Sequence, residues 1–303
     1  MNDTNKRYAL GKVLSVGSSS EGNAYYVELN RKGYPTPFKL LIDCGFSYGE
    51  LSRRLMKHNV SINDINAILV SHEHQDHSEA VSELVRLGKK VYAPNDVFIR
   101  AGVKDKVNPK YILQERKYKF IGDRIKILPI PLEHKNPDGS LVTNFGYIIQ
   151  FDCDYGVHSI LYVIDTHMVE YNLSGFKFNT IFIEANNRAY VIKNAMDNEE
   201  KKNGKSFKFY HYDRVLHSHM LVENTVKTLL GSKRDNIAGF DLSETNNIYL
   251  THMSANEQVS PNNIKMYVVE ALRKHNKLRN KEIKGRSIEL PIVKIFTKHG
   301  SMM

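Results

Sequence analysis

The chain has few cysteines and no long apolar run, and each of these absences excludes a class of protein. Only two of its 303 residues are cysteine, Cys44 and Cys153. Two thiols cannot build a disulfide framework or an all-cysteine zinc site, and such sparse usage is typical of a reducing cytosol. No apolar stretch reaches the ~18 residues of a membrane-spanning helix, and the first residues lack the apolar core of a secretory signal. We therefore expect a cytoplasmic protein without membrane association.

Composition and charge indicate a soluble globular protein with a polyanionic partner. Apolar residues make up 41% of the chain and charged residues 25%, as in ordinary globular domains. The length is sufficient for one large domain, which we expect to span residues 1–303. Lysine and arginine number 43 against 33 acidic residues, which gives a net charge of +10. Such a surplus favours a nucleic acid or nucleotide substrate, although improved solubility is the alternative explanation.

Hydrophobic periodicity predicts strands first, then helices between strands. No internal repeat is present. This order favours a two-sheet sandwich with helices outside over a simple alternating α/β fold. Ser78 is expected to cap one helix and Gly88 to end it. The predicted strands cover 11–19, 23–30, 38–46, 65–71, 91–93, 117–122, 124–134, 143–152, 159–167, 179–186, 246–252 and 289–296, and the predicted helices cover 48–59, 78–88, 221–231 and 261–279.

Two polar segments do not fit the predicted core. Residues around 188–214 are charged and interrupted by Gly204, and we expect an exposed inserted loop or lid there. The aromatic and basic stretch at 207–212 could stack on bases or close over a substrate. A basic segment, residues 274–303, is either a phosphate-binding patch or the solvated end of a helix.

The strongest motif is Ser-His-Glu-His-Gln-Asp-His at 71–77. Imidazole and carboxylate groups are good ligands for zinc, manganese or iron. His72 and His74 can point the same way from an extended segment, and Asp76 and His77 follow where that segment turns into a helix. Four ligands so close together suit two metal ions sharing a site better than a single tetrahedral ion. The alternative is a surface histidine cluster.

Four other polar residues each follow an apolar run, where a strand should end. They are Asp43, His134, Asp165 and His252. Taken singly, each would be interpreted as a capping or turn residue. Together with the histidine motif, their common position predicts that they converge on one end of the fold, since sites gather on loops held by a rigid scaffold.

These motifs resemble the metallo-β-lactamase superfamily, and within it most nearly the YycJ/WalJ-type, tRNase Z-like metal-dependent hydrolases. The resemblance extends over about residues 12–272. It includes Leu-Leu-Ile-Asp-Cys-Gly at 40–45, the Ser-Ser-Ser-Glu-Gly-Asn turn at 18–23, Ile-Glu-Ala-Asn-Asn at 183–187 and His-Met-Ser at 252–254. It implies an α/β fold, a four-layer αββα sandwich, with a dinuclear metal site between the two sheets.

The resemblance also implies a role for each residue of the site. Two divalent ions are implied, with zinc favoured and manganese as the alternative. The ligands implied for the first ion are His72, His74 and His134, and those implied for the second are Asp76, His77 and His252. Asp165 would bridge the ions, Asp76 would also belong to the catalytic group, and Asp43 would orient the His/Asp loop from behind the ligands.

A proton donor is implied by the related tRNase Z enzymes, which use a glutamate and a histidine. Glu184 resembles that glutamate. His219 fits the YycJ-type spacing of the histidine better, and His217 fits the tRNase Z spacing slightly better, so both stay open with His219 preferred. A carboxylate can raise the pKa of an imidazole so that it donates a proton near neutral pH. The family usually has glycine at the position of His167. This departure puts the substrate specificity in doubt more than it does metal binding.

The predicted function is a dinuclear metal-dependent phosphodiesterase, a nuclease acting on DNA or RNA. One alternative is a cyclic nucleotide phosphodiesterase of the anti-defence type, with the polar insertion excluding polymers. Another is hydrolysis of a small ester, thioester, lactone or β-lactam, which the positive charge disfavours. A third alternative is a non-catalytic binding module that is stabilised by metal. Such a module would lack one of the metal-ligating residues, and none of them is missing from this sequence. The sequence leaves the oligomeric state open, a homodimer included.

Overall fold

The first six strands form one sheet in sequence order, β1-β2-β3-β4-β5-β6. The computed structural model describes residues 8–103, 110–253, 260–282 and 290–296. The first three strands pair antiparallel and the last four parallel, so helical crossovers are needed between the parallel strands. The elements are β1 Leu10–Ser19, β2 Gly22–Leu29, β3 Phe38–Ile42, α1 Tyr48–Met56, η1 Ile62–Asp64, β4 Ala67–Leu69, α2 Gln75–Ser78, α3 Val81–Arg86, β5 Val91–Ala93, α4 Asn95–Arg100 and β6 Tyr111–Ile112.

The second sheet has the strand order β13-β12-β11-β10-β9-β8-β7. Its strands β7 and β8 pair antiparallel, whereas β11, β12 and β13 pair parallel. The elements are β7 Lys119–Gly122, β8 Ile125–Leu132, β9 Asn144–Cys153, β10 Gly156–Val163, β11 Thr180–Glu184, α5 Ala189–Asn203, α6 Phe207–Ser218, α7 Val222–Leu230, β12 Asn247–Thr251, α8 Pro261–Glu282 and β13 Ile292–Ile295. None of the helices in the described ranges combines the length and apolar character needed to cross a membrane.

The chain divides into two compact units. Unit one contains the described residues of 1–131 and 143–160, and unit two those of 132–142 and 161–296. Each unit has its own helices and its own group of buried polar side chains. The sequence predicted one domain over residues 1–303, and these two units lie within that span.

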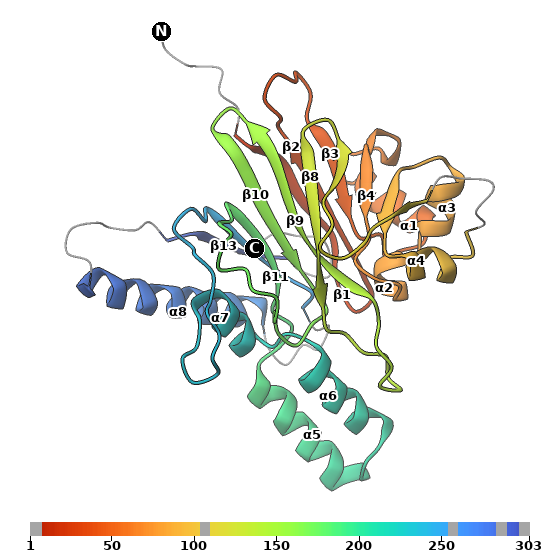
Figure 1. The fold of residues 1–303 in the computed structure, drawn as a ribbon. Helices are drawn as coiled ribbons and strands as arrows, with labels where there is room; N and C mark the ends of the chain where they lie inside the picture. The colour runs from red at the N-terminus through yellow and green to blue at the C-terminus, as the bar shows by residue number, and fades with distance from the viewer. Residues whose placement is uncertain (1–7, 104–109, 254–259, 283–289, 297–303) are drawn as a thin grey trace. The chain divides into compact units, whose positions relative to one another are not determined.

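In unit one, helices cover a face of the six-strand sheet. Leu51 of α1, Leu84 of α3 and Phe98 of α4 are fully buried and belong to one apolar cluster with Tyr26 of β2 and Leu41 of β3. Figure 1 shows α1, α3 and α4 beside the β3 and β4 end of this sheet. Burial of these side chains is the main favourable contribution to packing the helices on the sheet.

Within unit one, β9 contacts the segment that directly follows β4. The hydroxyl of Tyr147, which is fully buried on β9, donates to the carbonyl of Val70 at 2.5 Å. The backbone N–H of Phe145 donates to the carbonyl of Ser71 at 3.0 Å. These bonds fix the residues that directly follow β4, which is where the histidine motif begins. The predicted α/β class with two sheets is confirmed.

In unit two, α7 packs against β11 and α8, and α8 packs against β13. The strands β11 and β12 are parallel, with Glu184 opposite Thr251 at their carboxyl ends. Parallel strands place their carboxyl ends at the same edge of a sheet. The residues that follow β11 and β12 are therefore held near one another.

The segment around 188–214, expected as an inserted loop or lid, forms two helices. Figure 1 shows α5 and α6 side by side, and Ile192 and Leu216 bury a small apolar cluster between them. Gly204 separates the helices with φ of +66°, a conformation that glycine adopts readily. The sequence did not indicate these helices because few apolar residues pack them together, which leaves little hydrophobic periodicity. Of residues 274–303, those at 274–282 belong to α8, those at 290–296 include β13, and the remainder lies outside the described residues.

One local expectation was wrong, and one helix was not predicted. Ser78 does not begin a helix: it ends α2, and its hydroxyl donates to the carbonyls of Glu73 and His74 at 2.8 and 3.0 Å. The helix starts earlier because the chain turns immediately after His74. Residues 95–100, for which no helix was predicted, form α4, which buries only Val97 and Phe98, too few apolar side chains to show a periodicity. Gly88 lies directly beyond the end of α3 with φ of +77°, as predicted.

Candidate active site

The histidine motif forms a compact cluster in unit one. His72 and His77 are fully buried, and the ring centroid of His72 lies 4.3 Å from that of His77 and 4.7 Å from that of His74. Because α2 begins directly after His74, Asp76 and His77 occupy its first turn. Oδ2 of Asp76 lies 3.3 Å from Nε2 of His77. The expected change from extended chain to helix is confirmed, and it gathers all four side chains.

Asp43 supports this cluster from the end of β3. Its Oδ2 lies 2.8 Å from Nδ1 of His77, and its Oδ1 accepts the backbone N–H of Ser71 at 2.7 Å. A carboxylate that binds one ring nitrogen fixes the orientation of the imidazole and leaves the other nitrogen to act as a ligand. Asp43 has φ of +60°, a conformation that is uncommon outside glycine and clusters at functional sites.

Two further residues position the motif, and sequence analysis gave neither a role. The amide nitrogen of Asn23 lies 3.1 Å from Nε2 of His77 and 3.3 Å from Oδ2 of Asp76. Its segment was expected as a turn, and it does connect the antiparallel strands β1 and β2; only the Gly-Asn pair in the family resemblance pointed to a further role. Gly45 leaves no room for a side chain, since a Cβ there would lie 1.7 Å from the carbonyl oxygen of Asp76.

Unit two contains a second cluster of buried acids and imidazoles. Ligand atoms of Asp165, Glu184, His219 and His252 all lie within 4.8 Å of one another. Oδ1 of Asp165 is 3.2 Å from Nε2 of His252 and 3.5 Å from Nδ1 of His219. His134 adjoins the cluster, with Nε2 at 3.9 Å from Oδ2 of Asp165. The structure thus brings together His134, Asp165, Glu184, His219 and His252, all of which the sequence singled out.

Backbone geometry explains how these side chains turn inward. Asp165 and His252 follow β10 and β12 with φ of +50° and +49°. Conformations of this kind cost free energy for residues with a Cβ and persist where the surrounding structure imposes them. Asn186 provides part of that structure, because its amide nitrogen donates to the carbonyl of His252 at 3.1 Å.

Glu184 and His219 form an ion pair in which the carboxylate is fully buried and the imidazole is 13% exposed. Oε1 of Glu184 lies 2.8 Å from Nδ1 of His219 and 3.2 Å from Nδ1 of His252. Burial alone would lower the pKa of His219, but the carboxylates of Glu184 and Asp165 outweigh it and raise the pKa to about 9. Burial likewise opposes the charge of Glu184, but His219 and His252 outweigh it and lower the pKa of this carboxyl.

His217, the alternative proton donor, lies elsewhere. Its side chain is 73% exposed, and its Nδ1 donates to the backbone carbonyl of Asp213 at 2.8 Å. His167 also faces a different way, with Nε2 at 3.2 Å from the amide nitrogen of Asn224 on α7. The structure therefore pairs Glu184 with His219 rather than with His217.

The side chains of both clusters suit divalent metal ions. They offer imidazole nitrogens and carboxylate oxygens, the donor set that zinc and manganese take. Asp165, Glu184 and His252 are each at most 2% exposed, and burying two carboxylates beside one another is costly without a compensating positive charge. The clusters can therefore bind metal ions, and the pair of Glu184 and His219 can deliver a proton.

Comparisons with known proteins agree with this chemistry. A family model described as the beta-lactamase superfamily domain matches residues 39–253. The exodeoxyribonuclease WalJ of Streptococcus pneumoniae is 28% identical over 262 residues, which span 82% of this chain and 88% of that protein.

Solved structures share the fold over nearly the whole chain. The metallo-β-lactamase fold protein YhfI of Bacillus subtilis has a TM-score of 0.56 and 15% identity, covering 96% of this chain and 97% of that one. Unliganded yeast PDE1 has a TM-score of 0.59 and 11% identity, covering 96% and 98%. At such low identity these two likenesses concern the fold alone.

Proposed function

This chain belongs to the beta-lactamase superfamily, and from that premise we propose that it is a metal-dependent phosphodiesterase that removes nucleotides from DNA. The observation that supports this most directly is the pair of Glu184 and His219 beside Asp165. Phosphodiester hydrolysis expels an alkoxide, which needs a proton, and this pair is suited to provide it.

The substrate class is supported by the curated relative and by charge. WalJ is named an exodeoxyribonuclease, and the similarity to it covers most of both chains. The net charge of +10 favours a polyanionic substrate over a thioester or a β-lactam. A cytoplasmic location is part of the same proposal, since the two cysteines are buried thiols of the kind found in a reducing compartment.

We further propose that two divalent metal ions bind here, zinc ahead of manganese. The proposed ligands are those expected from the sequence, His72, His74, Asp76, His77, His134, Asp165 and His252. When bound, such ions activate the attacking water and neutralise the negative charge on the phosphate. Asp43 holds His77 through its Nδ1, so that Nε2 stays directed as a ligand.

His219 is the proposed general acid. Its Nδ1 hydrogen-bonds to Glu184, which leaves the Nε2–H to donate to the leaving oxygen. Glu184 keeps the imidazole protonated, because its negative charge raises the pKa of His219 against the effect of burial. The buried carboxylate is in turn held by the backbone N–H of Thr166, which lies 3.3 Å from its Oε2.

The purified chain, reconstituted with zinc or manganese, tests this function on end-labelled single- and double-stranded DNA and RNA. Stepwise shortening of DNA from an end is expected, and Asp165→Ala should abolish it. Metal-bound protein that cleaves no polymer would contradict the proposal. Turnover of a cyclic nucleotide with all polymers left intact would favour the alternative of a small nucleotide substrate.

A further inference from the structure

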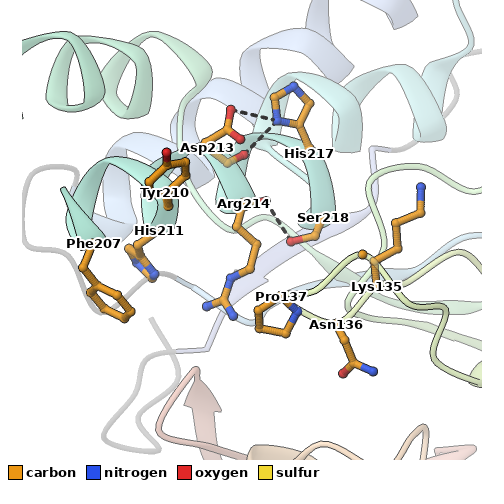
Figure 2. A pocket seen from close by; sticks show the side chains of 11 residues that line it. Lys135, Asn136, Pro137, Phe207, Tyr210, His211, Asp213, Arg214, His217 and Ser218 are labelled. Carbon is orange, nitrogen blue, oxygen red and sulfur yellow. Dashed lines mark hydrogen bonds and ion pairs between the residues drawn. The ribbon is translucent and has the colours of Figure 1, made fainter. Parts of the chain in front are cut away.

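Unit two contains a cavity of about 450 Å³ beside α6, apart from the cluster of Asp165 and Glu184. Its size falls within the range of ordinary ligand pockets, roughly 300–1,000 Å³. One wall is α6, and the other is the turn at 135–139 (Figure 2). None of the residues proposed above as metal ligands or proton donor lines it.

The α6 wall consists of one face of that helix. Phe207, His211, Arg214 and Ser218 all line the cavity, and their spacing of three or four residues places them on the same side of a helix. Figure 2 shows the side chains of Phe207, His211 and Arg214 extending together, with Arg214 directed toward Pro137. The face thus presents a ring, an imidazole and a guanidinium in a row.

This face combines exposed aromatic rings with a cation. Phe207 is 89% exposed and Tyr210 59%. No carboxylate among the described residues forms an ion pair with the guanidinium of Arg214, and the acid that lines the cavity, Asp213, lies 3.4 Å from Nδ1 of His217 instead. Exposed rings beside a free guanidinium are what proteins use to stack on bases and to contact phosphates.

The opposite wall is a rigid turn. The N–H of Gly139 donates to the carbonyl of Asn136 at 2.9 Å, and the N–H of Ser140 donates to Oδ1 of Asp138 at 2.9 Å. Lys135 and Leu141 form an antiparallel bridge across its base. An Asn-Pro-Asp-Gly sequence favours such a turn without further support, so this wall is formed before any ligand binds.

Both walls continue directly into the candidate site. The turn begins immediately after His134, and α6 ends immediately before His219, which is its C-cap. The ring centroids of His134 and His219 lie 6.1 Å apart. A chain of phosphates with one bond at His219 would therefore find its next positions along α6.

We propose that this cavity binds the nucleotide adjacent to the cleaved bond of the DNA strand, with Arg214 on a phosphate and Phe207 and Tyr210 stacked on bases. The inference rests on the proposed function, because it assigns a place to more of the same substrate. It implies that a single strand lies along α6, since paired bases would not expose their faces to these rings.

Binding without catalysis provides the first test. The metal-loaded wild-type protein and its variants are titrated into a fluorescein-labelled single-stranded DNA of about ten nucleotides, a length that one binding site can cover. Phosphorothioate linkages in this DNA slow its hydrolysis during the titration. Phe207→Ala and Arg214→Gln should each weaken binding at least about fivefold, whereas Phe207→Tyr, which keeps a ring, should stay close to wild type. Tyr190→Ala and Lys202→Gln change an exposed ring and an exposed cation on α5, outside the cavity, and serve as matched controls.

Catalysis provides the second test, with an ordinary phosphodiester oligonucleotide of the same sequence and with methyl p-nitrophenyl phosphate, a small diester that has neither a base nor a second phosphate to place in the cavity. For Phe207→Ala and Arg214→Gln, the loss in kcat/KM should be at least about fivefold greater on the oligonucleotide than on the small ester, the minimum expected for one lost stack. Equal losses on both substrates would overturn the inference, because the changes would then act on the reaction itself.

The possible failures are distinguishable. In one outcome, the wild-type protein shortens DNA and the cavity variants bind and cleave it as well as the controls do. This outcome would overturn the role of the cavity and leave the proposed function intact. A metal-loaded wild-type protein that hydrolyses the small ester but neither binds nor shortens DNA would overturn the proposed function, and this inference with it. If the cavity binds another protein instead of DNA, the cavity variants should likewise bind and cleave DNA as well as the controls do.

Discussion

Nδ1 of His219 lies 2.8 Å from Oε1 of Glu184, and the two residues come from different kinds of element. Glu184 is the last residue of β11, and its backbone carbonyl accepts the hydroxyl of Thr225 at 2.7 Å. His219 caps the carboxyl end of α6. A strand end and a helix end thus fix the two groups independently. The proposed proton donor therefore depends on how α6 ends.

Replacement of the proposed donor should reduce turnover and leave the metal ions bound. His219→Ala is expected to lower the rate on DNA by about 10²–10⁴-fold, the usual range for loss of a general acid. The loss should shrink on a p-nitrophenyl ester, because p-nitrophenolate leaves without a proton. Steady-state rates on both substrates and metal content per chain are the measurements. If His219→Ala strips a metal ion, His219 is a ligand and the proposed role is wrong.

His217→Ala is the matched control, since it removes the same side chain two positions away. His217 is exposed and bonded to the backbone carbonyl of Asp213, so its removal should leave kcat at saturating DNA near wild type. Because His217 lines the cavity beside α6, a change in KM alone would not count against this expectation. If His217→Ala shows the loss and His219→Ala does not, His217 is the proton donor and the histidine spacing of the tRNase Z enzymes applies to this chain. If neither does, water supplies the proton.

The pH profile should report the partner of the imidazole. A general acid works only while protonated, so turnover should fall as pH rises through the pKa of His219. Burial lowers that pKa and the charges of Glu184 and Asp165 raise it, to about 9. Glu184→Gln removes one of these charges, and the alkaline fall in kcat should therefore move to lower pH. A fall that stays at the same pH in this variant would assign it to another group.

Asp43 should influence metal affinity through His77. Asp43→Asn keeps an acceptor for the N–H of Ser71, and asparagine tolerates positive φ, but it loses the charge that faces Nδ1 of His77. Zinc affinity, measured by chelator competition, should fall about 10–100-fold. Asp43→Ala should show that loss and also unfold more easily by about 1–3 kcal/mol, because a buried N–H loses its partner. Unchanged affinity in Asp43→Asn would refute the orienting role.

The sequence predicted the residues of the histidine motif because their geometry is local. His72 and His74 alternate along an extended segment, and Asp76 and His77 begin a helix, so spacing alone indicates that they meet. Asp165 and His252 follow β10 and β12, which are the two neighbours of β11 in the sheet, and they are thereby brought to Glu184 from distant parts of the chain. For Asp165 and His252, only their position after an apolar run and the family resemblance pointed to a site, and for Glu184 the resemblance alone did.

The choice between His217 and His219 could not be made from sequence. It depends on α6, which was expected as a loop because the segment is polar. In the structure His217 still lies within the helix, and its Nδ1 bonds to the carbonyl four residues before it. His219 leaves the helix with φ of −114° and ψ of 151°, which redirects its side chain toward Glu184. A helix that ended two residues earlier would place His217 at the C-cap instead.

Sequence analysis assigned no role to Gly45 for a related reason, because its importance arises from a contact with a segment that is distant in the chain. A Cβ at this position would lie 1.7 Å from the carbonyl oxygen of Asp76 and 2.7 Å from the backbone nitrogen of His77. Both neighbours are backbone atoms of α2 and cannot rotate away. Gly45→Ala must therefore displace the turn that holds two of the proposed ligands.

We expect Gly45→Ala to lower the free energy of unfolding by about 1–3 kcal/mol or more, as overpacking does, and to reduce metal content per chain. Gly49→Ala is the matched control, because Gly49 lies in α1 and a Cβ added there would meet no atom within 4 Å. There alanine should stabilise the helix by roughly 0.5–1 kcal/mol. Urea denaturation and metal analysis of both variants decide the matter: equal stability and equal metal content would show that α2 can move aside, and that Gly45 does not set the position of Asp76 and His77.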